Sequence, residues 1–251
     1  QMEIDCSQSS QFASAILLIG ERIGLKKMII IPQNVPSLPY LILTKEVIKR
    51  VTQNTHAFSI EDIESDWSGA LFWYALCSLS SGSAFVFKNL SLDSLQGDAI
   101  ISRWFNQLDV ETTPLGKDIM IRHKVSPIIP PHDLSFDLLQ HPDLAPVLSI
   151  LLLLKEKEST LTGLQNLNFK ESNRFDLIFN TLHQFSEVSV LDDNTLTIKQ
   201  PKAPQNEQLL FCSHQDHRWV MAFLLFAVHN VIEMDDVECL KKSYPLFWSN
   251  F

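Results

Sequence analysis

The stretch that decides the fold class is residues 141–154, which read His-Pro-Asp-Leu-Ala-Pro-Val-Leu-Ser-Ile-Leu-Leu-Leu-Leu. A short polar opening that ends at Asp143 leads into an almost wholly apolar segment. A membrane-spanning helix needs about 20 apolar residues, so this segment is too short to cross a bilayer. Because it is apolar on every face, we predict a helix buried inside a protein core.

The same plan of an acidic opening and an apolar helix occurs four times in the chain. The acidic markers are Asp5, Asp66, Asp143 and Asp216, and the predicted helices cover residues 12–19, 70–79, 144–154 and 219–228. Short β-rich stretches follow at residues 27–31, 83–88, 159–162 and 230–233. Four copies of one arrangement indicate an internal structural repeat.

A second, two-faced helix is predicted in each copy, beginning near Ser37, Gln96, Glu171 and Lys242. In the third copy, residues 188–191 and 195–199 then form a strand pair around a turn-like Asp-Asp-Asn. The predicted plan is therefore strand, buried helix, strand, surface helix and two strands. Repeated βαβαββ units of this kind place the chain in the α/β (α+β) class, with sheets covering buried helices.

Composition limits the classes of function. The 251 residues are 45% hydrophobic and 20% charged, so the chain can form a full core and is not disordered. A net charge of −9 argues against nucleic acid as the main partner, although it allows a small anionic ligand. Four widely spaced cysteines without a CxxC pair favour a reduced, cytoplasmic protein. Gln1 is not an initiator, and we expect that sequence upstream of it has been removed or is not represented.

The helix openings also carry polar motifs in a fixed order. They are Ser9-Ser10-Gln11, Ser37-x-Pro39-Tyr40, Pro142-Asp143, Asn166 with Lys170-Glu171-x-x-Arg174, Asp216-His217-Arg218, and Lys242 before Pro245. Together they resemble the EPSP synthase (3-phosphoshikimate 1-carboxyvinyltransferase) family, the enolpyruvyl transferases of the shikimate pathway. The resemblance runs along essentially all 251 residues.

The resemblance implies an inverse α/β barrel-like enolpyruvyl transferase fold with two domains of three βαβαββ units each. Residues 1–64 would be the last unit of the shikimate-phosphate-binding domain, and residues 65–251 would be the second domain. The implied protein is a cytoplasmic transferase of chorismate and aromatic amino acid biosynthesis. It would act as a monomer on shikimate 3-phosphate and phosphoenolpyruvate, without a cofactor, metal, membrane or nucleic-acid partner.

The resemblance also assigns roles to single residues. Asp143 would take the proton from the 5-hydroxyl of shikimate 3-phosphate, and Glu171 would protonate the methylene carbon of the enol. The residues implied to bind shikimate 3-phosphate are Ser9, Ser10, Gln11, Ser37, Tyr40, Asp143, Asn166 and Lys170. Those implied to bind phosphoenolpyruvate are Gln11, Arg174, His217, Arg218 and Lys242.

Several features depart from the family pattern. Two basic segments that help to hold the substrates, one bearing Lys and Arg and one reading Asn-x-Gly-x-x-x-Arg, do not occur in residues 1–251. Asn173 stands where Asp is usual, and Leu38 stands where Lys is common. We therefore expect the C-terminal part of a longer, diverged enzyme, and the activity of residues 1–251 alone is doubtful.

Plainer interpretations of the same residues exist. Ser10 and Asp216 could be ordinary helix caps, and Glu171 with Arg174 could form a solvated ion pair three residues apart. The sequence argues against a zinc site at His217, because no second His or Cys stands at ligand spacing. Lys155-Glu156-Lys157-Glu158 is predicted to be a solvated turn.

Three alternative functions remain open. The first is a related transferase that acts on UDP-N-acetylglucosamine, although Ser9-Ser10-Gln11 and Lys170-Glu171 favour the shikimate enzyme. The second is a non-catalytic member or binding module of the same fold. The third is a structural repeat protein with fortuitous motifs.

Overall fold

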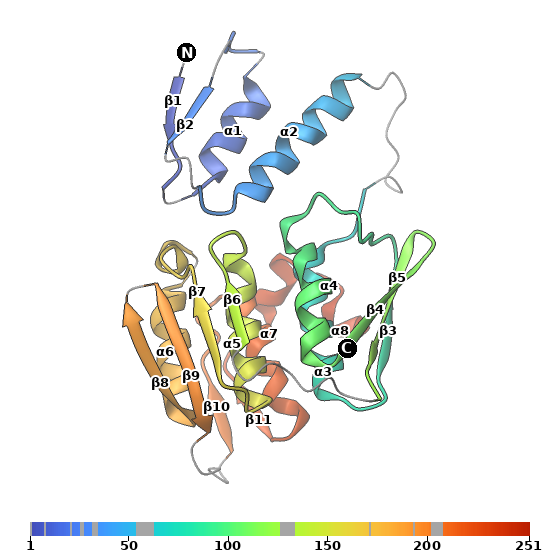
Figure 1. Cartoon of the computed structure of the whole chain (residues 1–251), viewed down its shortest axis with the longest axis vertical. Helices are drawn as coiled ribbons and strands as arrows, with labels where there is room; N and C mark the ends of the chain where they lie inside the picture. The colour runs from blue at the N-terminus through green and yellow to red at the C-terminus, as the bar shows by residue number, and fades with distance from the viewer. Residues whose placement is uncertain are drawn as a thin grey trace.

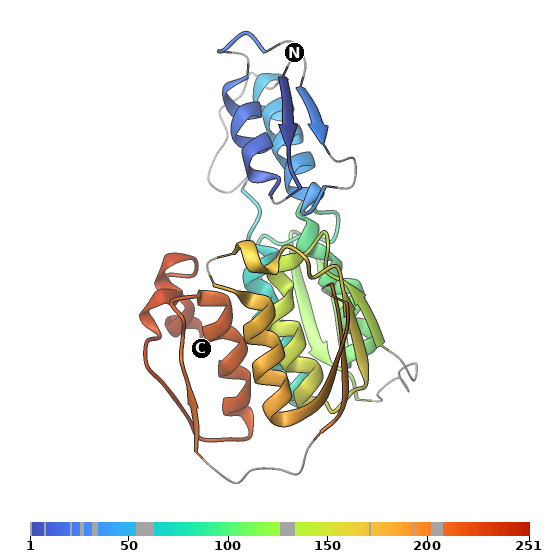
Figure 2. The ribbon, with the colours of Figure 1, turned by 90° about the vertical axis from the view of Figure 1, so that its left-hand side faces the viewer.

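The computed structural model describes residues 2–7, 9–20, 22–25, 28–31, 35–53, 63–125, 134–170, 172–192, 194–201 and 208–251. Of residues 28–31, 200 and 201, only the backbone is described. Figures 1 and 2 show a small N-terminal unit, residues 2–53, lying against one end of a larger main body, residues 63–251.

The N-terminal unit contains two strands and two helices, in the order β1 (Met2–Asp5), α1 (Gln11–Ile19), β2 (Met28–Ile31) and α2 (Leu38–Gln53). β1 and β2 pair in parallel, with Met2 opposite Met28. Both helices begin at the end of the unit that faces the main body (Figure 1). The predicted strand–helix–strand–helix order of the first repeat is confirmed, and the second helix begins at Leu38, next to the predicted Ser37.

The third repeat shows the complete predicted plan. Its elements are β6 (Leu134–Asp137), η4 (Pro142–Leu144), α5 (Ala145–Leu154), β7 (Ser159–Thr162), η5 (Leu167–Phe169), α6 (Arg174–Phe185), β8 (Ser186–Asp192) and β9 (Thr195–Pro201). The sheet order is β6-β7-β9-β8, in which β6 and β7 are parallel and β9 is antiparallel to both of its neighbours. The predicted strand pair around residues 188–199 is therefore confirmed.

The second repeat varies the plan in its surface helix, which is divided into short turns. Its elements are α3 (Trp67–Leu79), β3 (Ala84–Phe87), η2 (Gly97–Ile100), α4 (Ile101–Trp104), η3 (Phe105–Leu108), β4 (Val110–Leu115) and β5 (Asp118–His123). The antiparallel sheet has the order β3-β5-β4.

The fourth repeat is built from short elements in the described part of the chain. It consists of β10 (Leu209–Phe211), α7 (His217–Leu224), η6 (Leu225–Val228), β11 (Ile232–Met234), η7 (Glu238–Lys242) and α8 (Phe247–Asn250). β10 and β11 pair in parallel, as β6 and β7 do. The second helix predicted near Lys242 is replaced by two short turns, η7 and α8.

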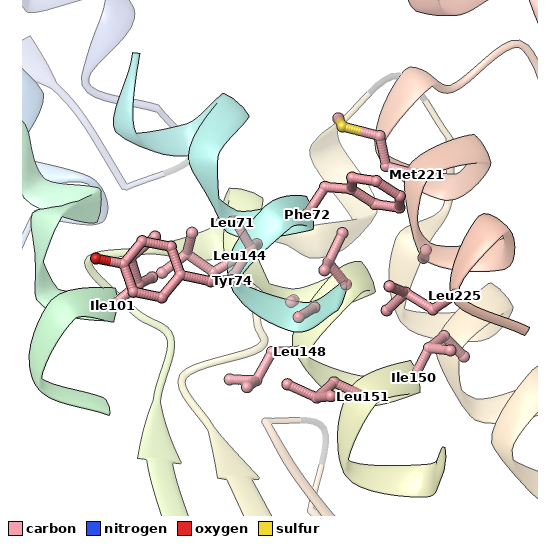
Figure 3. Packing of buried hydrophobic residues seen from close by; sticks show 14 of the residues in the cluster. Leu71, Phe72, Tyr74, Ile101, Leu144, Leu148, Ile150, Leu151, Met221 and Leu225 are labelled. Atoms are coloured by element: carbon pink, nitrogen blue, oxygen red, sulfur yellow. The ribbon is translucent and has the colours of Figure 1, made fainter. Parts of the chain in front are cut away.

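The predicted apolar helices of the main body form its core. Nine of the ten residues of α5, from Ala145 to Leu153, are buried. α5 packs against both α3 and α7, and Figure 3 shows Phe72 of α3, Leu148 of α5 and Met221 of α7 in the same cluster. The sheets lie outside this helical core, which is why these helices are apolar on all faces.

The prediction that every apolar helix is buried is wrong for α1. Ala13 is the only residue of this helix that is buried, whereas Phe12 is 64% exposed and Leu18 is 67% exposed. The unit has a small separate core of Cys6, Ala13, Val35 and Leu41. Two helices and two strands provide too little surface to surround an apolar helix.

Candidate active site

Asp143 is the point at which the positive side chains of the site meet. It lies in η4, directly before α5. Its Oδ1 is 2.8 Å from Nη1 of Arg174 and 3.2 Å from Nζ of Lys170, and its Oδ2 is 3.8 Å from Nη2 of Arg218. The openings of α5, α6 and α7 thus place one carboxylate among three cations. Local charge here is positive although the whole chain is acidic.

The charge environment makes Asp143 a strong acid. Burial alone would raise the pKa of its carboxyl, but the positive charges of Arg218, Lys170 and Arg174 outweigh burial and hold the pKa well below its usual range. The side chain is 30% exposed, so a ligand can reach it from solvent. The carboxylate is therefore ionised and accessible.

Asp216 is buried next to this cluster and contacts both Arg174 and Arg218. Its fully buried carboxylate accepts hydrogen bonds from Nε of Arg174 at 2.8 Å and from Nη2 of Arg174 at 3.1 Å. It also accepts from Oγ of Ser172 at 2.9 Å and from the backbone N–H of Arg218 at 2.9 Å. Burial opposes ionisation, but these bonds and the charge of Arg174 lower the pKa of Asp216. The predicted helix cap is confirmed, and the same side chain also orients a guanidinium.

The side chains of Arg218 and Asn166 each have a buried nitrogen that could donate a hydrogen bond to a ligand. Nη1 of Arg218 donates to the carbonyl of Ser68 at 3.2 Å, which connects α7 to the start of α3. Its buried Nε has no hydrogen-bond partner among the described residues, and neither has Nδ2 of Asn166, which is 6% exposed. Buried donors of this kind are costly unless a bound group satisfies them.

A second polar cluster lies at the start of the N-terminal unit's helices. Oγ of Ser10 donates to the carbonyl of Ser37 at 3.2 Å, and the same carbonyl accepts from the backbone N–H of Tyr40. The hydroxyl of Tyr40 lies 3.3 Å from Oγ of Ser68. Since the carbonyl of Ser68 accepts from Arg218, a continuous chain of contacts joins the two clusters.

The structure brings together most of the predicted site residues. Asp143, Lys170, Arg174 and Arg218 form one cluster, and Ser10, Ser37 and Tyr40 form the other. Ser9 and Gln11 lie at the start of α1, where Oγ of Ser9 accepts from the N–H of Gln11. Buried His217 occupies the first turn of α7, next to Arg218.

Glu171 lies outside the described residues, and Lys242 is exposed at the end of η7. The roles of both stay predictions. The alternative of a solvated surface pair at Arg174 is wrong, because its side chain is 1% exposed and turns inward to Asp143 and Asp216.

Asp98, Ser68 and Ser172 were not predicted to belong to the site. Asp98 and Ser68 contact Tyr40, and Ser172 contacts Asp216. The Gln96-Gly97-Asp98 segment was predicted only as a helix start, and no pattern in the sequence pairs Asp98 with a tyrosine 58 residues away.

A groove of about 1140 Å³ lies elsewhere on the main body, between β3 and residues 243–250. Trp73, Phe85 and Tyr244 are among its lining residues, and none of the predicted site residues lines it. In the part of the chain that the structure describes, no group of three or more His, Cys, Asp or Glu side chains could hold a metal ion. Nor is any described helix long and apolar enough to span a membrane.

Comparison with known proteins identifies the family. The sequence model described as EPSP synthase (3-phosphoshikimate 1-carboxyvinyltransferase) matches residues 1–251. The chain belongs to the EPSP synthase family. The resemblance inferred from the helix-opening motifs is thereby confirmed.

Individual EPSP synthases and structures agree with this membership. The 3-phosphoshikimate 1-carboxyvinyltransferase of Bacteroides fragilis is 27% identical over 96% of this chain and 62% of its own length. That of Dehalococcoides mccartyi is 30% identical over 96% of this chain and 59% of its own length. The chain therefore spans about 60% of the length of these curated relatives.

Two solved structures show the fold. An EPSP synthase from Acinetobacter baumannii aligns with a TM-score of 0.54, at 21% identity, over 74% of this chain and 44% of the other. The enolpyruvyl transferase NikO from Streptomyces tendae aligns with a TM-score of 0.54, at 15% identity, over 75% and 42%. The predicted enolpyruvyl transferase fold is confirmed.

Proposed function

We propose that the protein transfers the enolpyruvyl group of phosphoenolpyruvate to the 5-hydroxyl of shikimate 3-phosphate, giving 5-enolpyruvylshikimate 3-phosphate and phosphate. The observation that carries this proposal is the Asp143 carboxylate held among Lys170, Arg174 and Arg218. This cluster is joined to the polar helix starts of the N-terminal unit. Two anionic substrates require such a concentration of positive charge, because their mutual repulsion must be overcome.

The two clusters divide the substrates between them. We assign shikimate 3-phosphate to Ser9, Ser10, Gln11, Ser37, Tyr40, Asn166 and Lys170, with Asp143 at its 5-hydroxyl. Phosphoenolpyruvate is assigned to Gln11, Arg174, His217, Arg218 and Lys242. Arg174 and Arg218 suit a carboxylate because a guanidinium can donate two parallel hydrogen bonds. The proposed domains are residues 1–64 and 65–251, so the site lies where they meet.

Asp143 and Glu171 would exchange the protons of an addition followed by an elimination. In the addition, Asp143 takes the proton of the 5-hydroxyl, the hydroxyl oxygen bonds to the central carbon of phosphoenolpyruvate, and Glu171 protonates the methylene carbon. In the elimination, the resulting methyl carbon returns a proton to Glu171, and the C–O bond to phosphate breaks. The departing phosphate takes the proton held by Asp143, so both carboxyl groups return to their starting states. With three cations beside it, Asp143 is a weak base in the free protein. Bound anions would neutralise these cations and raise its basicity.

The test is release of phosphate from phosphoenolpyruvate with shikimate 3-phosphate as acceptor, compared with UDP-N-acetylglucosamine as acceptor. It is made on this chain and on the longer protein that any upstream sequence encodes. We expect release with shikimate 3-phosphate only, and we expect Asp143→Asn and Glu171→Gln each to lower kcat at least about 100-fold. Full activity in both variants would show that the mechanism is wrong.

Calorimetry separates the remaining alternatives. Binding of shikimate 3-phosphate without turnover, in the longer protein as well as in this chain, would indicate a non-catalytic member of the fold. Absence of binding with and without phosphoenolpyruvate would leave only a structural protein. Release of phosphate with UDP-N-acetylglucosamine would identify the related transferase.

A further inference from the structure

Asp98 is a fully buried carboxylate that no part of the proposed reaction uses. It lies in η2, and its Oδ2 accepts hydrogen bonds from the hydroxyl of Tyr40 at 2.8 Å and from Oγ of Ser68 at 2.5 Å. Its Oδ1 lies 3.5 Å from Nδ1 of His141, and neither atom has a hydrogen-bond partner among the described residues. Burying a carboxylate costs free energy unless hydrogen bonds compensate, so Asp98 is stable only where its partners Tyr40 and Ser68 can donate to it.

The partners of Asp98 come from three separate segments of the chain. Tyr40 lies in α2 of the N-terminal unit, and Ser68 lies in the first turn of α3, where its carbonyl accepts from Arg218. His141 directly precedes η4, which contains Asp143. Asp98 thus contacts the N-terminal unit through Tyr40. It also contacts the main body through Ser68, which binds Arg218, and lies near His141, which precedes the turn that contains Asp143.

The backbone beside Asp98 lies close to the N-terminal unit. A Cβ atom added to Gly97 would lie 2.6 Å from Cβ of Pro39 in α2, so only glycine allows this approach. The backbone N–H of Ser37 donates to the carbonyl of Leu139, and that of Leu38 donates to Oε1 of Gln140 at 2.7 Å. Polar contacts to a few residues therefore join the start of α2 to the main body.

We propose that Asp98 is a positioning residue, which holds the start of α2 against the main body so that Ser37 and Tyr40 face the Asp143 cluster. The contact is charge-assisted, since a neutral phenol and a hydroxyl donate to a carboxylate. Burial and the charge of Asp98 raise the pKa of Tyr40 far above its usual value, so the phenol keeps its proton. The consequence for shikimate 3-phosphate rests on the proposed function, whereas the positioning of α2 does not.

Hydrogen exchange of the 251-residue chain tests the positioning directly. We expect Asp98→Ala and Tyr40→Phe each to speed exchange of the amides of Ser37 and Leu38 about 10- to 100-fold, the effect of losing a hydrogen bond to a charged group. Because both variants remove the same contact, the double variant should exchange scarcely faster than Asp98→Ala alone. Asp98→Asn keeps an acceptor for the phenol and should restore part of the protection.

Tyr74→Phe is the matched control. Tyr74 is also buried, and its hydroxyl lies 3.0 Å from Oγ1 of Thr112, entirely inside the main body. This variant should leave exchange at Ser37 and Leu38 unchanged. Wild-type exchange in Tyr40→Phe, or fully additive effects in the double variant, would overturn the proposal. If Asp98→Ala does not fold, the comparison of Tyr40→Phe with Tyr74→Phe decides the outcome.

Kinetics of the active, longer protein give a second readout. Tyr40→Phe and Asp98→Asn should raise KM for shikimate 3-phosphate about 10-fold, with KM for phosphoenolpyruvate changed much less. A general loss of stability would lower the amount of active protein without this selectivity. Equal changes in both KM values would contradict the assigned position of Asp98. Absence of turnover in the parent protein would refute the proposed function but leave the exchange result to decide the positioning.

Discussion

Arg174 and Asp216 form a buried pair in which two guanidinium nitrogens meet two carboxylate oxygens, Nε with Oδ2 at 2.8 Å and Nη2 with Oδ1 at 3.1 Å. The remaining Nη1 of Arg174 is directed to Asp143 at 2.8 Å. The guanidinium of Arg174 is thus held on one side by the fully buried carboxylate of Asp216. On its other side it contacts the partly exposed carboxylate of Asp143. This arrangement determines the orientation of the cation closest to the proposed catalytic base.

We expect Asp216→Ala to lower the free energy of unfolding by about 3–5 kcal/mol, because it leaves Arg174 buried with one of its carboxylates removed. It also removes the cap of α7. Urea unfolding at pH 7 measures the change. Glu238→Ala is the control, since Glu238 pairs with Lys241 on the surface and its removal should cost less than about 1 kcal/mol. Equal losses in the two variants would contradict a structural role for the buried pair.

The stability that Asp143 contributes should depend on pH. The cations lower the pKa of Asp143 in the folded chain, so its contribution is complete above the unfolded pKa of about 3.9 and is lost as the pH falls through the lower folded value. At pH 7 we expect Asp143→Asn to be less stable than the parent by about 2 kcal/mol. The gap should be constant from about pH 7 to pH 5 and should narrow below about pH 4. Denaturant unfolding across this pH range measures the difference in stability. A difference that does not change with pH would show that the neighbouring cations do not lower the pKa of Asp143.

Anion binding should reverse part of this pKa shift. A phosphate bound at Lys170, Arg174 or Arg218 competes with Asp143 for positive charge, so the pKa of Asp143 should rise toward its usual value. A fraction of a proton should then be taken up at about pH 3.5, below the usual pKa of an aspartate. Calorimetric titration with inorganic phosphate, repeated in buffers of different ionisation enthalpy, measures that uptake. The Asp143→Asn variant is the control, because any proton uptake that it shows comes from phosphate and from groups other than Asp143. Equal proton uptake in the parent and in the variant would show that bound phosphate does not change the pKa of Asp143.

The sequence predicts the repeat and the local elements well, because both depend on residues that are close along the chain. The strand at residues 159–162 is observed with the predicted bounds, and the buried segment after Asp143 becomes α5. The second helix that was expected to begin near Glu171 likewise becomes α6, which begins at Arg174. Hydrophobic periodicity and caps are local signals, and here they are sufficient.

Side-chain partners that lie far apart in sequence are not predicted in the same way. Lys155 was assigned to a solvated turn, yet its side chain is 10% exposed and its Nζ lies 2.7 Å from Oδ2 of Asp109. The pairs Arg174–Asp216 and Tyr40–Asp98 also depend on how the repeats pack. The family motifs identify which charged residues gather at the helix openings, whereas only the packing shows which carboxylate each cation meets.

Gly163 supports the segment that leads into the site, and its replacement is the sharpest test of that packing. It follows β7 with a φ of +73°, and an added Cβ would lie 2.3 Å from the backbone N of Leu139 and 2.4 Å from Oδ1 of Asp137. Backbone atoms cannot move aside as a flexible side chain can. We therefore expect Gly163→Ala to lower the free energy of unfolding by about 2–4 kcal/mol, from backbone strain and overpacking together.

Gly116→Ala is the matched control for this prediction. Gly116 has a φ of +65°, but no atom lies within 4 Å of an added Cβ, so its replacement should cost only about 1–2 kcal/mol of strain. Urea unfolding compares the two variants. Because the carbonyl of Leu139 accepts from the N–H of Ser37, Gly163→Ala should also speed exchange of that amide, whereas Gly116→Ala should not. Similar stability losses and unchanged exchange in both variants would show that the 137–140 segment yields to the new methyl group without disturbing the site.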